Sequence, residues 1–453
     1  MRASGFLLFL VLPLHAAVIG TSKPAEPLTE ERIRAIVPAS QRGPWLAYLH
    51  RSEEQMKADR AVLAKEREGM TEIPPLPPQG FSGRAIPLHR DAAFYKSDDA
   101  RKIGDVILSF QTPAGGWSKN LAMTAPRLKG QSYATANLAP VDSPSGDFDK
   151  PQDEKWHYIG TLDNDATNTE LHFLAELSAA LPEHEGDSYR SGFLRGIEYL
   201  LHAQYPNGGW PQVWPLEGGY HDAITFNDDA VTESAQTLSL VAEGKRTRAE
   251  HKDGARATEA ETPEEDYTFV PAALRARAKA SVAKALDCIL KAQVRIPAAD
   301  GKATELTVWP QQADMLTLQP VAARNYEPAA LSSGESASVM EYLMSLDRPS
   351  PAVVRSLHAA ADWMQAHKIM GYTWSGGRGT PGGRKLTAVE GAGPLWARYY
   401  SLTTGKPIFG DRDKTIHDDV KEISLERRNG YAWYSDGPAH VLADYAAWWT
   451  THP

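Results

Sequence analysis

The segment QYPNGGWPQ (residues 204–212), followed by ITFNDDA (residues 224–230), lies near the middle of the chain and has relatives within the same sequence. QTPAGGW (residues 111–117) repeats its pattern, and Gln293 followed by WPQ (residues 309–311) repeats it with a longer loop. In each copy an apolar, helix-like segment runs into the glutamine, at 103–110, 197–203 and 285–292. A unit of helix, glycine turn and tryptophan that occurs at least three times is typical of a repeat architecture.

Composition limits the classes of protein to consider. The chain has 453 residues, 42% of them hydrophobic, which is enough for a sizeable core. Its net charge of −9 argues against general binding to nucleic acid. The single cysteine, Cys288, cannot form an intramolecular disulfide and lies in an amphipathic stretch, so we expect a buried structural thiol.

The N-terminus has the pattern of an export signal. One arginine precedes a short apolar run at 5–14 and the small residues at 16–17, so residues 1–17 are predicted to be a signal peptide. The run is too short to span a membrane, and no later segment is long and apolar enough. We therefore expect a secreted or periplasmic protein, a monomer, with residues 18–90 forming an N-terminal arm and helix.

Helical patterns dominate the rest of the chain. Helices are predicted at 44–69, 97–110, 168–180, 230–242, 271–292, 336–345, 350–367, 395–398 and 438–449. The long segment 126–158 is expected to be a polar loop, and the charged segment 245–266 a solvated, disordered insertion. Few strand-like alternations occur. The predicted fold is all-α, a ring of helical hairpins (an α/α toroid) over residues 91–450, with long loops forming a cleft at one end.

Two acidic clusters precede predicted helices. Asp163, Asn164 and Asp165 come before the helix at 168, and Asp228 and Asp229 before the helix at 230. Carboxylates there can cap free backbone N–H groups, or they can supply hard oxygen ligands for a cation such as Ca²⁺. Two such clusters in successive repeats would lie at the same end of a helical ring, which favours a shared cation site.

Other known catalytic motifs are missing from the sequence. There is no nucleophile elbow, zincin motif, phosphate-binding loop or dinucleotide fingerprint, and the 14 histidines do not cluster at zinc spacing. What remains beside the carboxylates is a set of cations on loops and helix ends, namely Lys119, Arg324, Arg398 and Arg412. Arg324 could pair with Glu327 on the surface or face an anionic ligand, and the sequence leaves this open. Carboxylates, a divalent cation and arginines together suit a polyanionic carbohydrate.

Several motifs also resemble polysaccharide lyase family 10, the pectate lyases. They are GGWSKN (115–120), DNDAT (163–167), QYPNGGWPQ, ITFNDDA, LTLQPVAARNYE (316–327), PLWARYY (394–400), PIFGDR (407–412) and ERRNGYAW (426–433). The resemblance runs in order over about 95–435. Residues 245–266 and the N-terminal part lie outside it.

The resemblance implies an (α/α)₃ toroid that cleaves polygalacturonate by Ca²⁺-dependent β-elimination and leaves 4,5-unsaturated oligogalacturonides. By resemblance Arg324 is the base that removes the C5 proton. The positions at which the family holds calcium are Asp163, Asn164, Asp228 and Asp229. The positions that hold substrate are Lys119, Asn120, Arg398 and Arg412.

The chemistry constrains the base. Arginine is almost always protonated, so we expect burial, Ca²⁺ and neighbouring cations to lower the pKa of Arg324, with activity rising at alkaline pH. Two alternatives remain on the same ring: a glycoside hydrolase with two carboxylates and a non-catalytic binder of acidic glycans. A terpene-cyclase-like toroid is disfavoured by the export signal and by the lack of an Asp-rich motif.

Overall fold

The computed structural model describes residues 18–452 apart from 81–85, 137–145, 151–152, 154, 183, 248–250, 253–254, 257–263 and 298–303. The predicted signal peptide lies outside the described residues. Within the charged insertion, the described parts form two short strand pairs, β3 (Lys245–Thr247) with β6 (Glu264–Asp266) and β4 (His251–Lys252) with β5 (Ala255–Arg256). The prediction of a wholly disordered insertion is therefore wrong for these strands.

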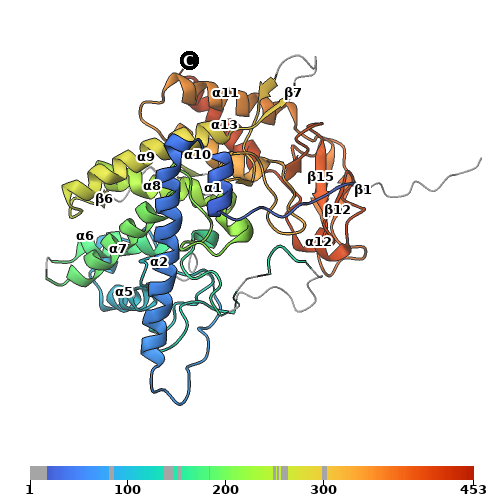
Figure 1. Ribbon diagram of the computed structural model, residues 1–453. Helices are drawn as coiled ribbons and strands as arrows, with labels where there is room; N and C mark the ends of the chain where they lie inside the picture. Colours follow the sequence, from blue (N-terminus) through green and yellow to red (C-terminus); the bar gives the residue numbers. More distant parts are fainter. Residues whose placement is uncertain are drawn as a thin grey trace, which may run out of the picture.

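Two layers of helices form the body of the described chain (Figure 1). One layer contains α5 (Asp98–Phe110), α7 (Asp187–Ala203), α9 (Ala272–Ala292) and α11 (Pro351–Ala366). The other contains α6 (Asn168–Ala180), α8 (Ala230–Glu243), α10 (Ser333–Met344) and α13 (Gly437–Trp449). Each helix of the second layer packs on the next one along, and α6, α8 and α10 also pair with α7, α9 and α11. Apart from 395–398 and the segment at 197–203, the predicted helices are present with ends within three residues of the prediction; α7 begins ten residues before 197.

Buried tryptophans satisfy the ends of four helices of the first layer. The last carbonyls of a helix have no partner within it. Here an indole nitrogen from the following loop donates to one of them, over 2.7–2.8 Å, in four pairs: Trp117 to Ile107, Trp210 to Leu200, Trp309 to Ile289 and Trp396 to Met364. The three predicted repeats are thus confirmed, and Trp396 adds a fourth that a long intervening loop hides in the sequence.

The repeated glutamines tie each loop to the next helix of the layer. Gln204 donates from Nε2 to the carbonyl oxygens of Gly208, at 2.9 Å, and of Ser281 in α9, at 3.0 Å. Gln111 and Gln293 do the same toward α7 and α11. Gly208 lies against α9 with a φ of +99°, where an added Cβ would sit 2.1 Å from the Lys284 carbonyl oxygen. Only glycine allows this approach.

The prediction of an all-α fold is wrong in one respect, because short strands fill the loops between helices. A five-stranded sheet has the order β1 (Val18–Thr21), β16 (Thr415–His417), β15 (Pro407–Gly410), β14 (Tyr399–Tyr400) and β10 (Leu331–Ser332). The predicted helix at 395–398 is instead β13 (Trp396–Ala397), paired with β17 (Tyr434–Ser435). Strands of two to four residues are too short to show a period-two alternation.

Three further strand pairs complete the loops. They are β2 (Ile224–Thr225) with β9 (Gln312–Ala313), β7 (Arg295–Pro297) with β8 (Thr304–Leu306), and β11 (Tyr372–Ser375) with β12 (Lys385–Ala388). Of the short helices, α4 (Ala92–Tyr95) packs on α5 and α6, and α12 (Leu425–Gly430) follows β16 in the chain. Cys288 is buried in α9, as predicted. No helix in the described ranges combines the length and apolar character that a membrane crossing needs.

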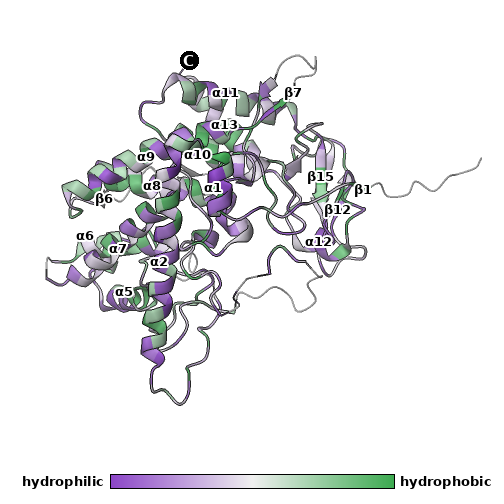
Figure 2. Ribbon diagram, viewed as in Figure 1, coloured by the Kyte–Doolittle hydropathy of each residue, from purple (hydrophilic) through white to green (hydrophobic). Residues whose placement is uncertain are grey.

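The N-terminal arm packs onto the body of the molecule. β1 joins the sheet, and α1 (Glu30–Ile36) and α2 (Arg42–Arg67) follow (Figure 1). In Figure 2, α1 is drawn largely in the hydrophilic colour. The main buried core nevertheless includes Ile33 from α1 and Trp45 and Tyr48 from α2. The Tyr48 hydroxyl donates to the Ala203 carbonyl oxygen at 2.9 Å, at the end of α7. The arm is therefore continuous with the repeat core.

Replacing Gln204 with alanine tests the link between repeats. The substitution leaves the buried carbonyl groups of Gly208 and Ser281 without their side-chain donor, so we expect the free energy of unfolding to fall by about 1–3 kcal/mol. Gln365→Ala, at an exposed position of α11, is the control and should change it by no more than about 0.5 kcal/mol. Urea unfolding measures both, and equal effects would refute the assigned role of Gln204.

Candidate active site

Two acidic turns meet at the beginnings of α6 and α8. The turn η2 (Asp163–Asp165) packs against the turn η4 (Asn227–Asp229). Asn164, Asp228 and Asp229 have φ values of 53°, 48° and 57°, in the left-handed region that Asn and Asp tolerate better than most residues. The side chain of Asp229, at the N-cap of α8, makes no capping hydrogen bond. The structure thus favours the second interpretation of these clusters, in which the carboxylates face one another.

Five of the predicted site residues form one cluster of contacts around Asp163. Lys119 forms an ion pair with Asp163 Oδ2. Asn164 Nδ2 donates to Asn120 Oδ1 at 3.1 Å, and the Asn164 backbone N–H donates to Asp228 Oδ2 at 3.4 Å. The Lys119 ammonium also lies 3.4 Å from the centre of the Tyr158 ring. The prediction that segments far apart in the sequence converge is therefore confirmed for Lys119, Asn120, Asp163, Asn164 and Asp228.

The carboxylates of Asp163 and Asp228 have opposite pKa shifts. Burial opposes the charge of Asp163, but Lys119 and other donors outweigh it and hold the pKa of Asp163 well below its usual range. Asp228 keeps one exposed side, yet the surrounding loops partly desolvate it, and this desolvation together with the charge of Asp163 raises its pKa. A cation between the two turns would relieve this repulsion, and carboxylate and amide oxygens are the ligands that Ca²⁺ takes. The donor set therefore fits a calcium ion.

Arg324 forms a bidentate ion pair with a buried carboxylate. Its Nε and Nη2 lie 2.8 and 2.5 Å from the two oxygens of Glu327, which is 2% exposed. Tyr431 donates to the same carboxylate at 2.6 Å. Sequence analysis left open whether Arg324 pairs with Glu327, and the structure shows that it does, although Glu327 is not on the surface. About a third of the Arg324 side chain remains exposed.

This pairing changes the expected protonation of Arg324. Burial would lower the pKa of Arg324, but the charge of Glu327 outweighs it and raises the pKa well above the ordinary value. Among the described side chains, Glu327 therefore opposes the expected lowering of the Arg324 pKa, and no sequence pattern indicates how closely this carboxylate approaches. The same pairing lowers the pKa of Glu327 to about 2, against the effect of its burial.

Two further cations extend the cluster. Arg398 donates to Asn227 Oδ1 at 3.0 Å, forms an ion pair with Glu335, and lies over the Tyr431 ring at 4.7 Å. It therefore connects the acidic turn η4 to the group around Arg324. Arg412 pairs with the exposed Glu426 at 2.9 Å.

Aromatic rings join these cations. Arg324, Arg412 and Arg427 lie 5.1, 5.5 and 4.4 Å from the centre of the Tyr326 ring. Arg398 and Arg412, two of the substrate-site cations expected from the sequence, thus each share an aromatic neighbour with Arg324.

Asp229 lies to one side of the main cluster. Burial and the nearby Glu335 raise the pKa of Asp229 to about 6, although Ser338 donates a hydrogen bond to it. Its carboxyl group thus belongs with Glu335 and α10, not with Lys119.

Four supporting residues of the site were not predicted from the sequence, namely Gln212, Glu335, Tyr326 and Tyr431. Gln212 donates to Asp163 at 2.9 Å. Gln212 ends the central repeat motif, which is the one signal that pointed to it.

The pH dependence of stability tests the Arg324–Glu327 pair. Since the pKa of Glu327 falls from 4.5 to about 2 on folding, the charged carboxylate stabilises the fold above about pH 4.5, and that stabilisation is lost as the pH falls. We expect a loss of about 2 kcal/mol from this group between pH 5 and pH 3.

The comparison uses two glutamine variants in urea unfolding at both pH values. In Glu327→Gln the group no longer titrates, so its free energy of unfolding should fall less than that of the wild type. Glu305→Gln, at an exposed position of β8, should keep the wild-type slope. Equal slopes for all three proteins would contradict the assigned pairing.

Comparison with known proteins places this arrangement in a family. A family model described as pectic acid lyase matches residues 111–442, which include every candidate site residue. Two solved structures are similar at a TM-score of 0.60 and 28% identity. The first is an aspartate-to-alanine mutant of a Family 10 polysaccharide lyase from Cellvibrio cellulosa in complex with trigalacturonic acid, covering 79% of this chain and 95% of that one.

The second is the Family 10 polysaccharide lyase from Cellvibrio cellulosa itself, covering 78% of this chain and 93% of that one. The comparison with curated proteins gave no match. The matching family model spans most of the chain and agrees with the motifs quoted above. The chain therefore belongs to the pectic acid lyase family.

Proposed function

We propose that this pectate lyase cleaves polygalacturonate by calcium-assisted β-elimination, in a site built from the two acidic turns and the cluster around Arg324. The single observation that carries the proposal is a continuous set of contacts. It runs from Lys119 and Asp163 across the Asn164–Asp228 contact of the two turns, and then through Asn227 and Arg398 to Tyr431 and Glu327. Such a site presents cations on both sides of a carboxylate pair. A uronic acid chain has one carboxylate in each sugar unit, and cations spaced along a site match that spacing.

Lys119, Asn120, Arg398 and Arg412 are proposed to hold the substrate. Arg398 is fixed by Asn227 and Glu335, and Arg412 by Glu426, so the guanidinium groups are oriented before a substrate arrives. Preorganised charges of this kind stabilise developing negative charge without reorganisation at the moment of reaction. The guanidinium groups of Arg398 and Arg412 suit planar carboxylates, because a guanidinium can bind a carboxylate through two parallel hydrogen bonds.

Asp163, Asn164, Asp228 and Asp229 are proposed as the calcium residues. The Asp163 oxygens already accept from Lys119 and Gln212, whereas Asp228 accepts only a long contact of 3.4 Å from Asn164 among the hydrogen bonds of the described residues. We therefore propose Asp228 as the principal calcium ligand. Bound calcium supplies a Lewis acid that polarises the C6 carboxylate of the sugar and makes the C5 proton more acidic.

Arg324 is proposed as the base. A neutral guanidine takes the C5 proton, and the electron pair of the C5–H bond forms the C4–C5 double bond. The bond from C4 to the glycosidic oxygen breaks, and the leaving oxygen keeps its electron pair and takes a proton from water. Glu327 holds Nε and Nη2, which leaves Nη1 outside that pair. The raised pKa makes the neutral form scarce but strongly basic, so turnover should rise with pH above neutrality.

The remaining expectations concern architecture and location. We propose that the helical hairpins form the (α/α)₃ toroid that the resemblance implies, with the acidic turns at its open end. Residues 1–17 are proposed to direct export, so that the enzyme acts outside the cytoplasm as a monomer. A glycoside hydrolase remains a weaker alternative, because the paired carboxylates here are bound to a cation and to amides instead of flanking an open gap.

Calcium dependence is the first test. Turnover of polygalacturonate, followed by the ultraviolet absorbance of the unsaturated product, should be lost on addition of EDTA and restored by excess Ca²⁺. Asp228→Asn keeps the size of the side chain but removes its charge, so its turnover should fall by at least about 100-fold at subsaturating Ca²⁺. The exposed Asp418→Asn serves as the control and should behave as the wild type. Hydrated instead of unsaturated ends would support the hydrolase.

The role of Arg324 needs a variant that keeps the buried Glu327 paired. Arg324→Ala would leave that carboxylate without its cation, which destabilises a fold by about 3–5 kcal/mol. Arg324→Lys keeps the charge but removes the guanidine base, so we expect the turnover number to fall by about 100-fold or more with the KM changed only a few-fold. Arg348→Lys, on the exposed loop between α10 and α11, is the matched control. A wild-type turnover number in Arg324→Lys would reject Arg324 as the base.

A further inference from the structure

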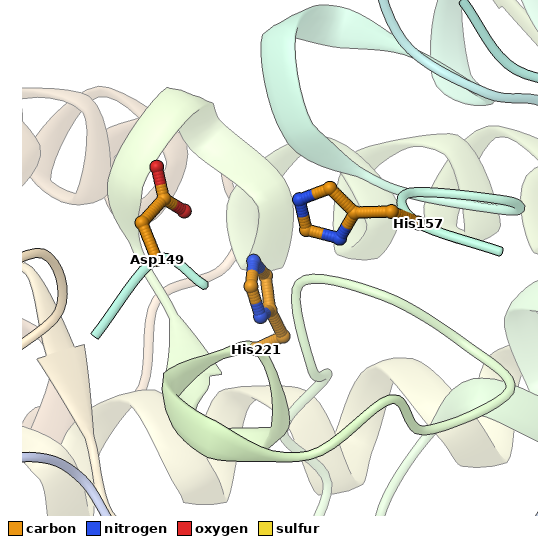
Figure 3. A group of neighbouring side chains, drawn as sticks. All are labelled: Asp149, His157 and His221. Atoms are coloured by element: carbon orange, nitrogen blue, oxygen red, sulfur yellow. The ribbon is translucent and has the colours of Figure 1, made fainter. Parts of the chain in front are cut away.

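A second group of metal-binding side chains lies beside the candidate active site. Asp149, His157 and His221 each direct one ligand atom into a common space, and these three atoms lie within 4.8 Å of one another. Figure 3 shows the ring of His221 directed between the carboxylate of Asp149 and the ring of His157. The two imidazole rings are nearly perpendicular, with centroids 5.4 Å apart. None of the three residues belongs to the acidic turns.

One carboxylate orients both histidines. His157 Nδ1 lies 3.0 Å and His221 Nδ1 3.5 Å from the same oxygen of the buried Glu217. When Nδ1 carries the proton that faces Glu217, Nε2 carries the lone pair on the opposite side of the ring. A carboxylate behind each histidine is the arrangement that holds imidazole ligands of metal ions in place. Here a single glutamate provides it for both rings.

The ring nitrogen of His221 that points into the cluster has no other use in the described part of the chain. His221 is 4% exposed, and its Nε2 is buried without a hydrogen-bond partner among the described residues. A buried polar atom left in this way costs about 1–3 kcal/mol, so a native structure ordinarily supplies it with a partner. A cation held by Nε2 of both histidines and by Asp149 would be that partner.

We infer that Asp149, His157 and His221 bind a divalent transition-metal ion, with Zn²⁺ as the representative, at a site distinct from the proposed calcium site. Two imidazole nitrogens and one carboxylate form a known three-residue zinc ligand set, whereas Ca²⁺ takes oxygen ligands. Ligand atoms at the usual zinc distances lie about 3.4 Å apart, so the ion would draw the three atoms together by about 1 Å. A cavity of about 450 Å³, lined in part by Phe148, Glu217 and His221, reaches the cluster at His221.

The position of Asp149 shows what the ion would do. The backbone N–H of its neighbour Phe148 donates to Asn325 Oδ1 at 2.9 Å, and Asn325 Nδ2 donates to the Arg412 carbonyl oxygen at 2.8 Å. Asn325 is adjacent to Arg324. The ion therefore links the segment around Asp149 to His157 and His221 on one side. On its other side, that segment contacts the loops of Arg324 and Arg412. It is a structural metal that keeps the two halves of the active site together.

The test is a zinc titration of the untagged full-length protein, freed of metal by chelation and kept in excess Ca²⁺. We expect one Zn²⁺ per chain by competition with a chromophoric chelator, a higher melting temperature with Zn²⁺, and, with Co²⁺ instead, the visible absorption of a tetrahedral nitrogen and oxygen site. Glu217→Gln should weaken zinc binding by about 10–100-fold. His221→Ala and Asp149→Asn should weaken it more than Glu217→Gln does.

Two controls separate this site from the proposed calcium site. His184→Ala, at a fully exposed position, should bind Zn²⁺ as the wild type does. Asp228→Asn should lose calcium-dependent turnover while keeping its bound Zn²⁺. Failure of the wild-type protein to bind Zn²⁺ or Co²⁺, with no change in melting temperature, would overturn the inference and would leave the proposed lyase mechanism untouched. Zinc binding that survives both His221→Ala and Asp149→Asn would overturn it as well.

Discussion

The rest of the structure depends on the satisfaction of helix ends in the first layer. Each of the four repeat tryptophans donates its indole N–H to a carbonyl of the helix before it, and the glutamines of three repeats donate to the helix of the next repeat. These contacts set the position of every loop relative to its neighbours. The acidic turns η2 and η4 follow two such loops and precede α6 and α8, which pack together. Their meeting is thus a consequence of the repeat.

Opposite charges are then held at short range by burial. The cations Lys119, Arg324 and Arg398 are each paired with a carboxylate that is less than a tenth exposed, on Asp163, Glu327 and Glu335. Removing charges from water is costly, and breaking such a pair leaves an uncompensated charge. The benefit is orientation, because the groups proposed to hold the polyanionic substrate are already in place. The cations gathered in the site would repel one another on their own, and each is held there by the carboxylate with which it pairs.

The sequence was a good guide to helices and to the convergence of the site, and a poor one to strands and to pairing distances. The helix Asp98–Phe110 agrees with its prediction because Ser97 caps it and its apolar residues recur on one face. Strands of two residues, such as Trp396–Ala397, depend on partners far along the chain and leave no local signal. His157 and His221 are likewise separated in sequence and joined only by the fold, so spacing could not reveal them. The raised pKa of Arg324 depends on Glu327 geometry that no pattern encodes.

The most direct measurement of the central claim is a crystal structure of the protein soaked with Ca²⁺ and a short oligogalacturonate, with the ion located by its anomalous scattering. The account predicts a calcium ion between η2 and η4, bound by Asp228, with a sugar carboxylate shared between the ion and Lys119 or Arg398, and C5 of that sugar facing Arg324. An ion and an oligosaccharide bound elsewhere on the molecule, with Asp163, Asp228 and Arg324 in contact with neither, would contradict it.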